Sequence, residues 1–378
     1  MPPRAPLCPH RPPCPGCPRF GEGGIPRDAA AALAALAREA GIPPPAVVEG
    51  APFGCRRRAR LMVRGRAASP KIGIFQQGTH RIVDVPRCLV HHPLVNTVAA
   101  AVKDAVRATG IPPYADRAHR GVVRAVQIVV ARAPEAAQVV LVANGDDPRD
   151  VAPLAARLAG ALGTSLHSLW WNGNPQRTNV VLGPHWARLA GPEAVRETIG
   201  GAAVYFPPGA FGQANLDLAD RLVARVAACV PDGARVLELH AGCGAIGLGL
   251  LARAEVAFNE VEAASLAGLE LGLAAAPPAA RRRATILPGP AAAHAGRVGE
   301  ADVVIVDPPR RGLEPALLDA LVATPPARLV AVSCGLPAFL REARRLLAGG
   351  RLALAELMAF ALFPHTGHTE VLARFERR

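Results

Sequence analysis

From about residue 201 to the end, short apolar runs alternate with helical stretches, and this alternation restricts the fold more than any other feature of the chain. The runs have the length and the Val, Leu and Ile content of buried strands. The seven expected strands are Arg235–Leu239, Val256–Phe258, Thr285–Leu287, Asp302–Val306, Leu329–Ser333, Arg351–Leu357 and about His368–Phe375. The expected helices include Ala245–Arg253, Ala263–Ala274, Pro315–Ala323 and Pro337–Leu347.

Such an alternation predicts an α/β, Rossmann-like fold with a mostly parallel seven-stranded sheet and helices on both faces. The last two strands have no helix between them, so we expect them to form an antiparallel hairpin at one edge of the sheet.

The first 200 residues are less regular, and we expect a separate α+β region there. Strand-like runs occupy Arg60–Val63, Val126–Ala131 and Gln138–Ala143. Helices are expected at about Asp28–Ala40 and at Val95–Ala108, where Gly110 and Pro112 end the second one. We therefore divide the chain into residues 1–200 and residues 201–378.

The formal net charge of the chain is +13, and nearly all of the excess comes from arginine. A basic excess of this size favours a polyanionic partner, because phosphates attract it and release counterions on contact. The simpler alternative is an Arg- and Ala-rich protein whose charge is spread evenly. Arg56, Arg57 and Arg58, followed by Arg60, Arg64 and Arg66, mark a basic strand that is either a solvated edge or an RNA-facing surface.

No run of 18 uncharged apolar residues is present, so we expect no membrane span. Met1–Pro18 is rich in Pro and Cys and lacks the apolar segment of a signal peptide. We therefore expect a cytoplasmic protein, and in that compartment eight cysteines indicate metal binding or catalysis rather than disulfides.

Glu238 stands near the end of the first expected strand, just before a tight turn that contains Gly242 and Gly244. An acid in front of such a turn suits a ligand with an ammonium or hydroxyl group rather than a pyrophosphate, and S-adenosylmethionine has both groups and no phosphate. Glu260 ends the next strand, where a carboxylate can accept hydrogen bonds from both ribose hydroxyls. A tight turn without a ligand is the alternative interpretation.

Three later strand ends carry further reactive groups: Asp307 in Asp-Pro-Pro-Arg, Cys334 in Ser-Cys-Gly, and Glu370 on the final hairpin. Ligands bind at the carboxyl ends of strands in open α/β sheets, so these groups can converge on one cleft. A nucleophilic Cys and a carboxylate base suit methylation of carbon 5 of uracil, which requires a thiolate on carbon 6 and removal of a proton from carbon 5. Taken alone, Cys334 would be interpreted as a small buried apolar residue, as we interpret Cys55, Cys229 and Cys243.

The ordered set of these motifs resembles the RNA uracil-C5 methyltransferase family over essentially the whole chain. The set comprises Phe211–Asn215, Glu238–Gly244, Asp307–Gly312, Ser333-Cys334 and Phe363–Glu370. The resemblance implies a class I S-adenosylmethionine-dependent methyltransferase domain in residues 201–378, with Cys334 as nucleophile and Glu370 as base. It also implies a donor and uracil pocket lined by Gln213, His240, Gly242, Gly244, Glu260 and Asp307.

The chain departs from the family pattern at three places in this region. His240 stands where an aromatic residue is common, Gly335 where Asn often follows the nucleophile, and Gly289-Pro290 where an acid is often found. The departures concern the donor contacts and the loop after the nucleophile, and they leave the implied reaction class unchanged.

Cys8, Cys14 and Cys17 form a tight cluster, and Cys88 is a distant fourth cysteine. Four thiolates suit an iron–sulfur cluster, while zinc with His10 or His91 as an additional ligand remains open on spacing alone. Some members of the family carry a 4Fe–4S cluster with this cysteine spacing, so the resemblance implies that cofactor here. We expect the cluster to help fold an RNA-binding region in residues 1–200.

The layout most resembles the short iron–sulfur enzymes that methylate 23S ribosomal RNA, although transfer RNA remains an alternative substrate. The target uridine must be unpaired or flipped, since the enzyme has to reach a base edge. We expect a monomer that does not contact membranes. Three alternative functions are an amino-group methyltransferase, a non-catalytic iron–sulfur RNA-binding protein and a metal-sensing regulator. The first of these would favour an aromatic residue where Arg310 stands.

Overall fold

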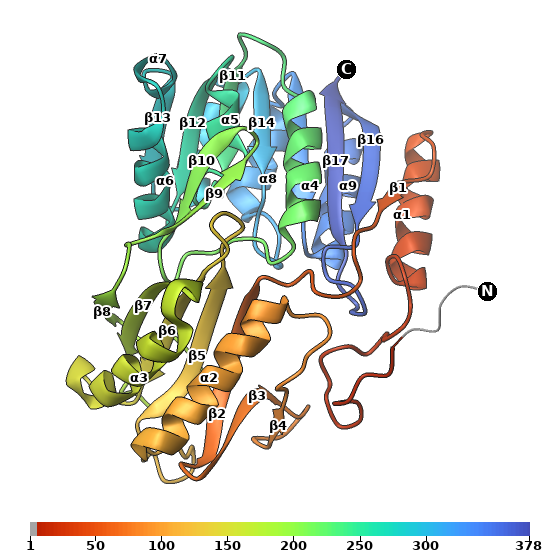
Figure 1. Ribbon diagram of the computed structural model, residues 1–378. Helices are drawn as coiled ribbons and strands as arrows, with labels where there is room; N and C mark the ends of the chain where they lie inside the picture. Colours follow the sequence, from red (N-terminus) through yellow and green to blue (C-terminus); the bar gives the residue numbers. More distant parts are fainter. Residues whose placement is uncertain (1–5) are drawn as a thin grey trace. The chain divides into compact units, whose positions relative to one another are not determined.

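The computed structural model of the protein describes residues 6–378, and within them the chain forms two compact units (Figure 1). The first unit contains the chain up to Gly21 together with Ala51–Val195, and the second contains Glu22–Gly50 together with Arg196–Arg378. Residues 22–50, which the sequence pattern grouped with the first region, therefore pack in the second unit. None of the helices described is both long enough and apolar enough to cross a lipid bilayer.

The second unit is built on an eight-stranded sheet in the order β1-β16-β17-β15-β14-β11-β12-β13. Its strands are β1 (Ala46–Val48), β11 (Arg235–Leu239), β12 (Glu255–Glu260), β13 (Ala284–Pro288), β14 (Val303–Val306), β15 (Arg328–Ser333), β16 (Leu352–Phe360) and β17 (Glu370–Arg377). All neighbours are parallel except β17, which runs antiparallel to both β15 and β16.

The seven predicted strands are all present, but the prediction of a seven-stranded sheet was wrong by one strand. β1 pairs in parallel with β16 and forms the edge of the sheet, so the β16–β17 hairpin does not lie at the edge. Three residues that follow a run of prolines give no periodic signal, and only the pairing with β16 makes them a strand.

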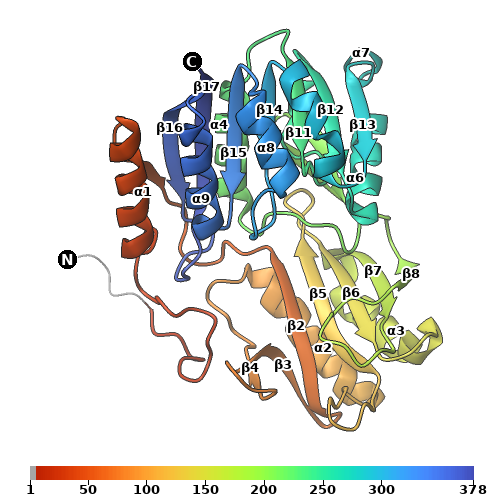
Figure 2. The same ribbon diagram turned by 180° about the vertical axis from the view of Figure 1, so that it is seen from behind.

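Helices cover both faces of this sheet, as the alternation predicted. One face carries α1 (Arg27–Ala40), η3 (Ala291–Glu300), α8 (Pro315–Ala323) and α9 (Leu336–Ala348), and Figure 2 shows α8 and α9 in front of the strands. The opposite face carries α4 (Leu216–Ala228), α5 (Gly247–Leu250), α6 (Ala263–Ala275) and the hairpin of β9 (Val195–Ile199) and β10 (Ala202–Phe206), with α7 (Pro278–Arg281) following α6. The predicted helix 245–253 is reduced to one α-helical turn, and α4 was not predicted.

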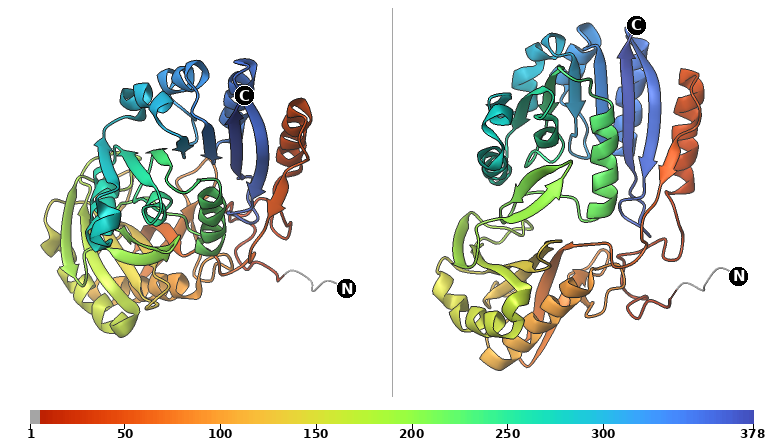
Figure 3. Two further views of the ribbon diagram at one scale, coloured as in Figure 1. Left: turned by 90° about the horizontal axis from the view of Figure 1, so that it is seen from above. Right: turned by 45° about the horizontal axis from the view of Figure 1, so that its top comes forward.

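Helix α1 belongs to the second unit because its apolar stripe is buried there. Leu33, Leu36 and Ala37 are fully buried and join the core formed by β16, α8 and α9. Figure 3 shows α1 beside the β16 end of the sheet. Burial of each leucine contributes up to about 2–3 kcal/mol, which explains why a short helix far away in sequence stays with this core.

The first unit contains a seven-stranded sheet in the order β4-β3-β2-β5-β6-β7-β8, where the sequence had indicated only three strands. The strands are β2 (Arg58–Arg66), β3 (Ser69–Phe75), β4 (Ile82–Asp84), β5 (Val123–Val130), β6 (Ala137–Ala143), β7 (Leu166–Gly173) and β8 (His185–Ala190). Helix α2 (Pro93–Thr109) packs beside α3 (Ala152–Leu162), which with the short helices η1 (Pro148–Val151) and η2 (Gly163–Ser165) connects the parallel strands β6 and β7. The unit is therefore of the expected α+β kind.

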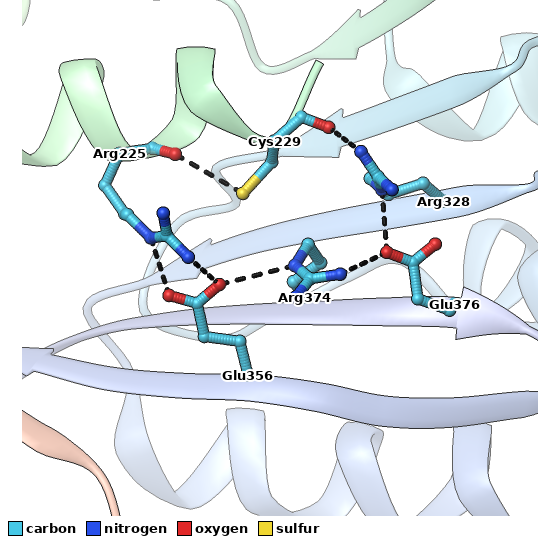
Figure 4. Close-up of polar contacts among 6 residues, drawn as sticks. All are labelled: Arg225, Cys229, Arg328, Glu356, Arg374 and Glu376. Carbon is cyan, nitrogen blue, oxygen red and sulfur yellow. Dashed lines mark hydrogen bonds and ion pairs between the residues drawn. The ribbon is translucent and has the colours of Figure 1, made fainter. Parts of the chain in front are cut away.

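A network of charged side chains ties α4 to strands β15–β17 of the second unit (Figure 4). Glu356 accepts hydrogen bonds from Arg225 of α4, with a 2.6 Å bond from Nε, and from Arg374 at 3.3 Å. Glu376 pairs with Arg374 and accepts a bond from Arg328 at 2.8 Å. The five side chains are partly buried, so solvent reaches the guanidinium groups only in part. The carboxylates therefore compensate the positive charge of these groups.

Replacing Glu356 with Gln is expected to lower the free energy of unfolding by about 1–3 kcal/mol, because the partly buried Arg225 guanidinium loses its anion and Arg374 retains only Glu376. Calorimetry is the suitable measurement, since all three tryptophans lie in the first unit and their fluorescence would not report on this network. Glu39→Gln is the matched control: its pair with Arg344 is about half exposed, so solvent screens it and its loss should destabilise the protein less. Equal losses in the two variants would contradict the prediction.

Candidate functional site

A cavity of about 690 Å³ opens in the second unit at the carboxyl ends of β11, β12, β14 and β15. Its size is that of a site for a small organic ligand, and its position is the one that open α/β sheets use. Seven of the eight residues predicted for the site line it: Gln213, His240, Gly242, Glu260, Asp307, Cys334 and Glu370. Gly244 does not line the cavity.

Gly244 instead lets the turn pack against the neighbouring helices. Its φ is +79°, and an added Cβ would lie 2.7 Å from Leu269 and 2.9 Å from Leu248. Only a residue without a side chain permits both this backbone conformation and this packing, so Gly244 shapes the turn without contacting the cavity.

Glu260 holds the glycine turn against the end of the next strand. One oxygen of its carboxylate accepts a 2.7 Å bond from the backbone N–H of Gly242, and the other accepts bonds from Val261 at 2.7 Å and Glu262 at 2.8 Å. A carboxylate has about four acceptor positions, so Glu260 can still accept bonds from a ligand. The parallel register of β11 and β12 brings these elements together.

His240 sits in the left-handed backbone region, with a φ of +60°, although it is not a glycine. Such a conformation costs a non-glycine residue about 1–2 kcal/mol. The ring Nδ1 is buried and has no hydrogen-bond partner, while Nε2 lies 3.9 Å from Glu314. Burial lowers the pKa of His240, and the nearby Glu314 only partly opposes this effect, so the ring is neutral at pH 7.

Cys334 and Glu370 are brought together by strand register. β15 and β17 pair so that Ser333 lies opposite Val371, which places Cys334 next to Glu370 just beyond the end of β15. Glu370 is 1% exposed, and its Oε1 has no hydrogen-bond partner. Asp307 follows β14, the parallel neighbour of β15, and lines the same cavity.

The pKa values of these groups reflect burial and mutual repulsion. Burial raises the pKa of the Asp307 carboxyl to about 6. Burial and then the charge of Asp307 raise the pKa of Glu370 well above 4.5, while Arg310 opposes the shift. Burial, Glu370 and Asp307 also raise the pKa of the Cys334 thiol, so the cysteine rests in its protonated form at pH 7.

Glu238 is a cavity residue that our predicted set of site residues omitted, although its position before the turn had been noted. It is 2% exposed, and its Oε2 lacks a hydrogen-bond partner. Burial and then the charge of Asp307 raise the pKa of Glu238 to about 8. Phe211 and Glu314 also line the cavity. The motif Phe211–Asn215 could have indicated Phe211, whereas no sequence motif indicated Glu314.

Gly335 allows the loop 307–312 to lie directly against the backbone that follows Cys334. A Cβ at this position would be 2.2 Å from the carbonyl oxygen of Arg310. The side chain of Arg310 also lies 3.3 Å from the His368 ring, which joins the loop to the final hairpin. The glycine that departs from the family pattern is thus required by the close approach of this loop.

The three cysteines near the N-terminus and Cys88 line a second, smaller cavity in the first unit. Cys8, Cys14, Cys17 and Cys88 line about 70 Å³ of space together with His10 and His91. Burial and then the charge of Cys88 raise the pKa of Cys17 to about 11, and burial lowers the pKa of His91 to about 4. Within residues 6–378, however, no group of three or more His, Cys, Asp or Glu side chains has the arrangement of a metal site.

An uncharacterised RNA methyltransferase of Protochlamydia amoebophila is 32% identical to the chain over 343 residues, which make up 88% of each protein. The chain belongs to the RNA methyltransferase family. A second uncharacterised RNA methyltransferase, from Gloeobacter violaceus, is 29% identical over 337 residues, 88% of the chain and 72% of its own length. A search with protein-family models found no match.

Among solved structures, this RNA methyltransferase is similar to the Pyrococcus abyssi tRNA (uracil-54, C5)-methyltransferase in complex with S-adenosyl-L-homocysteine. The TM-score is 0.74 at 23% sequence identity, and the match covers 92% of the chain and 83% of the other protein. This similarity confirms the predicted α/β fold.

Replacing Gly335 with Ala is expected to reduce methyl transfer to RNA at least tenfold. The new methyl group would displace the loop 307–312 by about 1 Å, and shifts of this size in an active site are costly. Single-turnover transfer of a radioactive methyl group measures the effect. Gly367→Ala is the control, because a Cβ there meets nothing within 4 Å. An unchanged rate in Gly335→Ala would show that the close approach is not needed.

Proposed function

We propose that this RNA methyltransferase transfers the methyl group of S-adenosylmethionine to carbon 5 of a uridine in RNA, through a covalent adduct with Cys334. The observation that carries the proposal is the position of a cysteine next to a buried carboxyl, Glu370, at the end of the cavity that would hold the donor. A cysteine nucleophile beside a base is the pair that activation of carbon 5 requires.

The cavity fits the donor in size and in the polar groups that it offers. Glu260 would accept hydrogen bonds from the ribose hydroxyls, and the backbone near Gly242 would approach the ligand closely. Gln213 and His240 each present a buried polar atom without a partner, which a polar ligand would satisfy. When bound, S-adenosylmethionine supplies an electrophilic methyl group on a sulfonium. Support also comes from the Pyrococcus abyssi enzyme, whose structure contains S-adenosyl-L-homocysteine.

In the proposed reaction the Cys334 thiol gives its proton to solvent, the thiolate adds to carbon 6 of uracil, and the electron pair of the 5,6 double bond moves toward carbon 5 and the carbonyl oxygen. Carbon 5 would then form its bond to the methyl group while the bond between the methyl group and the donor sulfur breaks, which leaves a neutral thioether. Glu370 removes the proton from carbon 5, the double bond forms again, and the thiolate leaves carbon 6. Burial makes Glu370 a stronger base than an exposed carboxylate, which suits removal of a carbon-bound proton.

We propose 23S ribosomal RNA as the substrate, on the basis of the resemblance of the chain to the short iron–sulfur enzymes of the family. The Pyrococcus abyssi neighbour acts on transfer RNA, so transfer RNA is the second candidate. The target uridine would be unpaired or flipped, and arginines of the first unit would contact phosphates. We also propose that the protein is cytoplasmic and that it is a monomer.

Replacing Cys334 with Ala is expected to abolish turnover, because the proposed reaction begins with the addition of the Cys334 thiolate to carbon 6. With the donor and 5-fluorouridine RNA, the wild-type protein should form a complex that survives denaturing electrophoresis, since fluorine on carbon 5 cannot leave as a proton does. Glu370→Gln should accumulate the same adduct on ordinary RNA.

Cys55→Ala, in the first unit, is the control and should behave like the wild type in each assay. Retained turnover in Cys334→Ala would eliminate the covalent mechanism and favour methylation of an amino group. Mass mapping of 5-methyluridine in cells with and without the protein would identify the RNA.

We further propose that Cys8, Cys14, Cys17 and Cys88 hold a 4Fe–4S cluster. Their thiols line one cavity, and the charge of Cys88 acts on Cys17, so the four groups are close enough to influence one another. Such a cluster takes four cysteine ligands. The cluster would have a structural role: it would link the N-terminal segment to the loop after β4 and so stabilise the first unit.

Protein purified without oxygen is expected to be brown and to contain about four iron atoms per chain, as a four-cysteine cluster requires. Cys88→Ser should lose the iron and the colour, whereas Cys55→Ser should retain both. Iron content and visible absorption measure the outcome. A colourless protein with about one zinc ion per chain would support the zinc alternative instead.

A further inference from the structure

The donor cavity is much richer in acids than in bases. Six acidic side chains line it: Glu238, Glu260, Glu262, Asp307, Glu314 and Glu370. The other titratable or charged groups around it are His240, Arg310, Arg311 and the thiols of Cys243 and Cys334. The residues that α4 contributes to the wall are apolar, and so are those from the β9–β10 hairpin. A cavity with this balance of charge favours a cation.

We call three of these acids, Glu238, Asp307 and Glu370, the carboxyl cluster. Asp307 acts electrostatically on both of the others. Glu238 and Glu370 are almost fully buried, and each has one oxygen without a hydrogen-bond partner. In the described part of the chain, no Lys, Arg or His forms an ion pair with any of the three within 4.0 Å.

Buried carboxyls without an ion-pair partner cannot all be ionised, because the charges repel one another and have lost water, and Arg310 only partly opposes this effect at Glu370. Burial accordingly raises the pKa of each of the three carboxyls, and repulsion from Asp307 raises the pKa values of Glu238 and Glu370 further. The free protein therefore keeps at least one proton in the carboxyl cluster at pH 6–7. A cation that enters the cavity would allow this proton to leave.

S-adenosylmethionine and its demethylated product differ at one atom that matters here: the donor carries a positive sulfonium, and the product carries a neutral thioether. Both have the same α-ammonium, carboxylate, ribose and adenine. A site that distinguishes the two must therefore respond to the sulfonium charge or to the methyl group itself.

We propose that the carboxyl cluster distinguishes donor from product by charge: it binds the sulfonium in ionised form and releases one proton, and it takes up a proton when the sulfonium has become neutral. The inference rests on the proposed methyl donor and goes beyond it by naming the residues that would sense the donor's charge. Asp307 would act on Glu370 in this arrangement, because their charges interact.

The proton balance gives the cluster a role in the order of steps. While the sulfonium is present, its charge stabilises ionised Glu370 and opposes the negative charge that keeps Cys334 protonated. Transfer of the methyl group removes that positive charge. Glu370 then becomes a stronger base at the stage when carbon 5 must lose its proton, and the proton released on binding is replaced by the one from carbon 5.

Calorimetric titration in two buffers with different protonation enthalpies counts the protons released on binding. At pH 6.5 we expect S-adenosylmethionine to release about one proton more than S-adenosyl-L-homocysteine. Between pH 5.5 and 7.0, below the range in which an α-amino group titrates, the ratio of the two affinities should rise by up to about tenfold per pH unit. Equal proton counts for the two ligands would overturn the inference.

Asp307→Asn and Glu238→Gln should each reduce both the extra proton release and the preference for the donor. Glu262→Gln is the matched control, since Glu262 is an exposed acid that lines the same cavity, and it should leave the proton count unchanged. Binding of S-adenosyl-L-homocysteine verifies that each variant is folded. If the wild-type protein bound neither ligand, the proposed function itself would fail, which differs from binding without a difference in proton release.

Discussion

The antiparallel insertion of β17 between β15 and β16 is the constraint on which the site depends. In a fully parallel sheet, all strands would present their carboxyl ends at the edge that carries the cavity. β17 presents its amino end there instead, so Glu370, its first residue, lies next to Cys334 at the end of β15. The charged network of Glu356, Arg374 and Glu376 lies on β16 and β17 and ties these strands to α4. The register of β17 and this network thus both involve the strand that begins with Glu370.

The second unit was largely predictable because its strands are short, apolar and regularly spaced. The meeting of the carboxyl ends of these strands follows from a general rule for parallel sheets, and this rule predicted that Asp307 and Cys334 lie near each other. The final hairpin was also anticipated. Its position inside the sheet was not, because β1 contains three residues and has no pattern of its own.

The first unit was harder to predict because its strands do not share one pattern. β5 and β6 are buried on both faces and read as continuous apolar runs, whereas β8 alternates between exposed and half-buried positions and carries His185 and Arg188. Within the site, Glu238 was noted for its position but not assigned a role. The sequence specifies which acids stand at strand ends, but only the folded chain shows that three of them share a cavity with little compensating charge.

The placement of residues 22–50 has a consequence for how the protein can be made and divided. Val48 pairs with Phe360, so the edge strand of the second unit is synthesised long before its partner leaves the ribosome. Contacts between residues so distant in sequence form late and slowly. A fragment that begins at residue 196 would lack both α1 and β1, and it would expose the edge of β16 together with the apolar surface that Leu33 and Leu36 cover. The second unit is therefore discontinuous in the chain, and no single cut separates the two units intact.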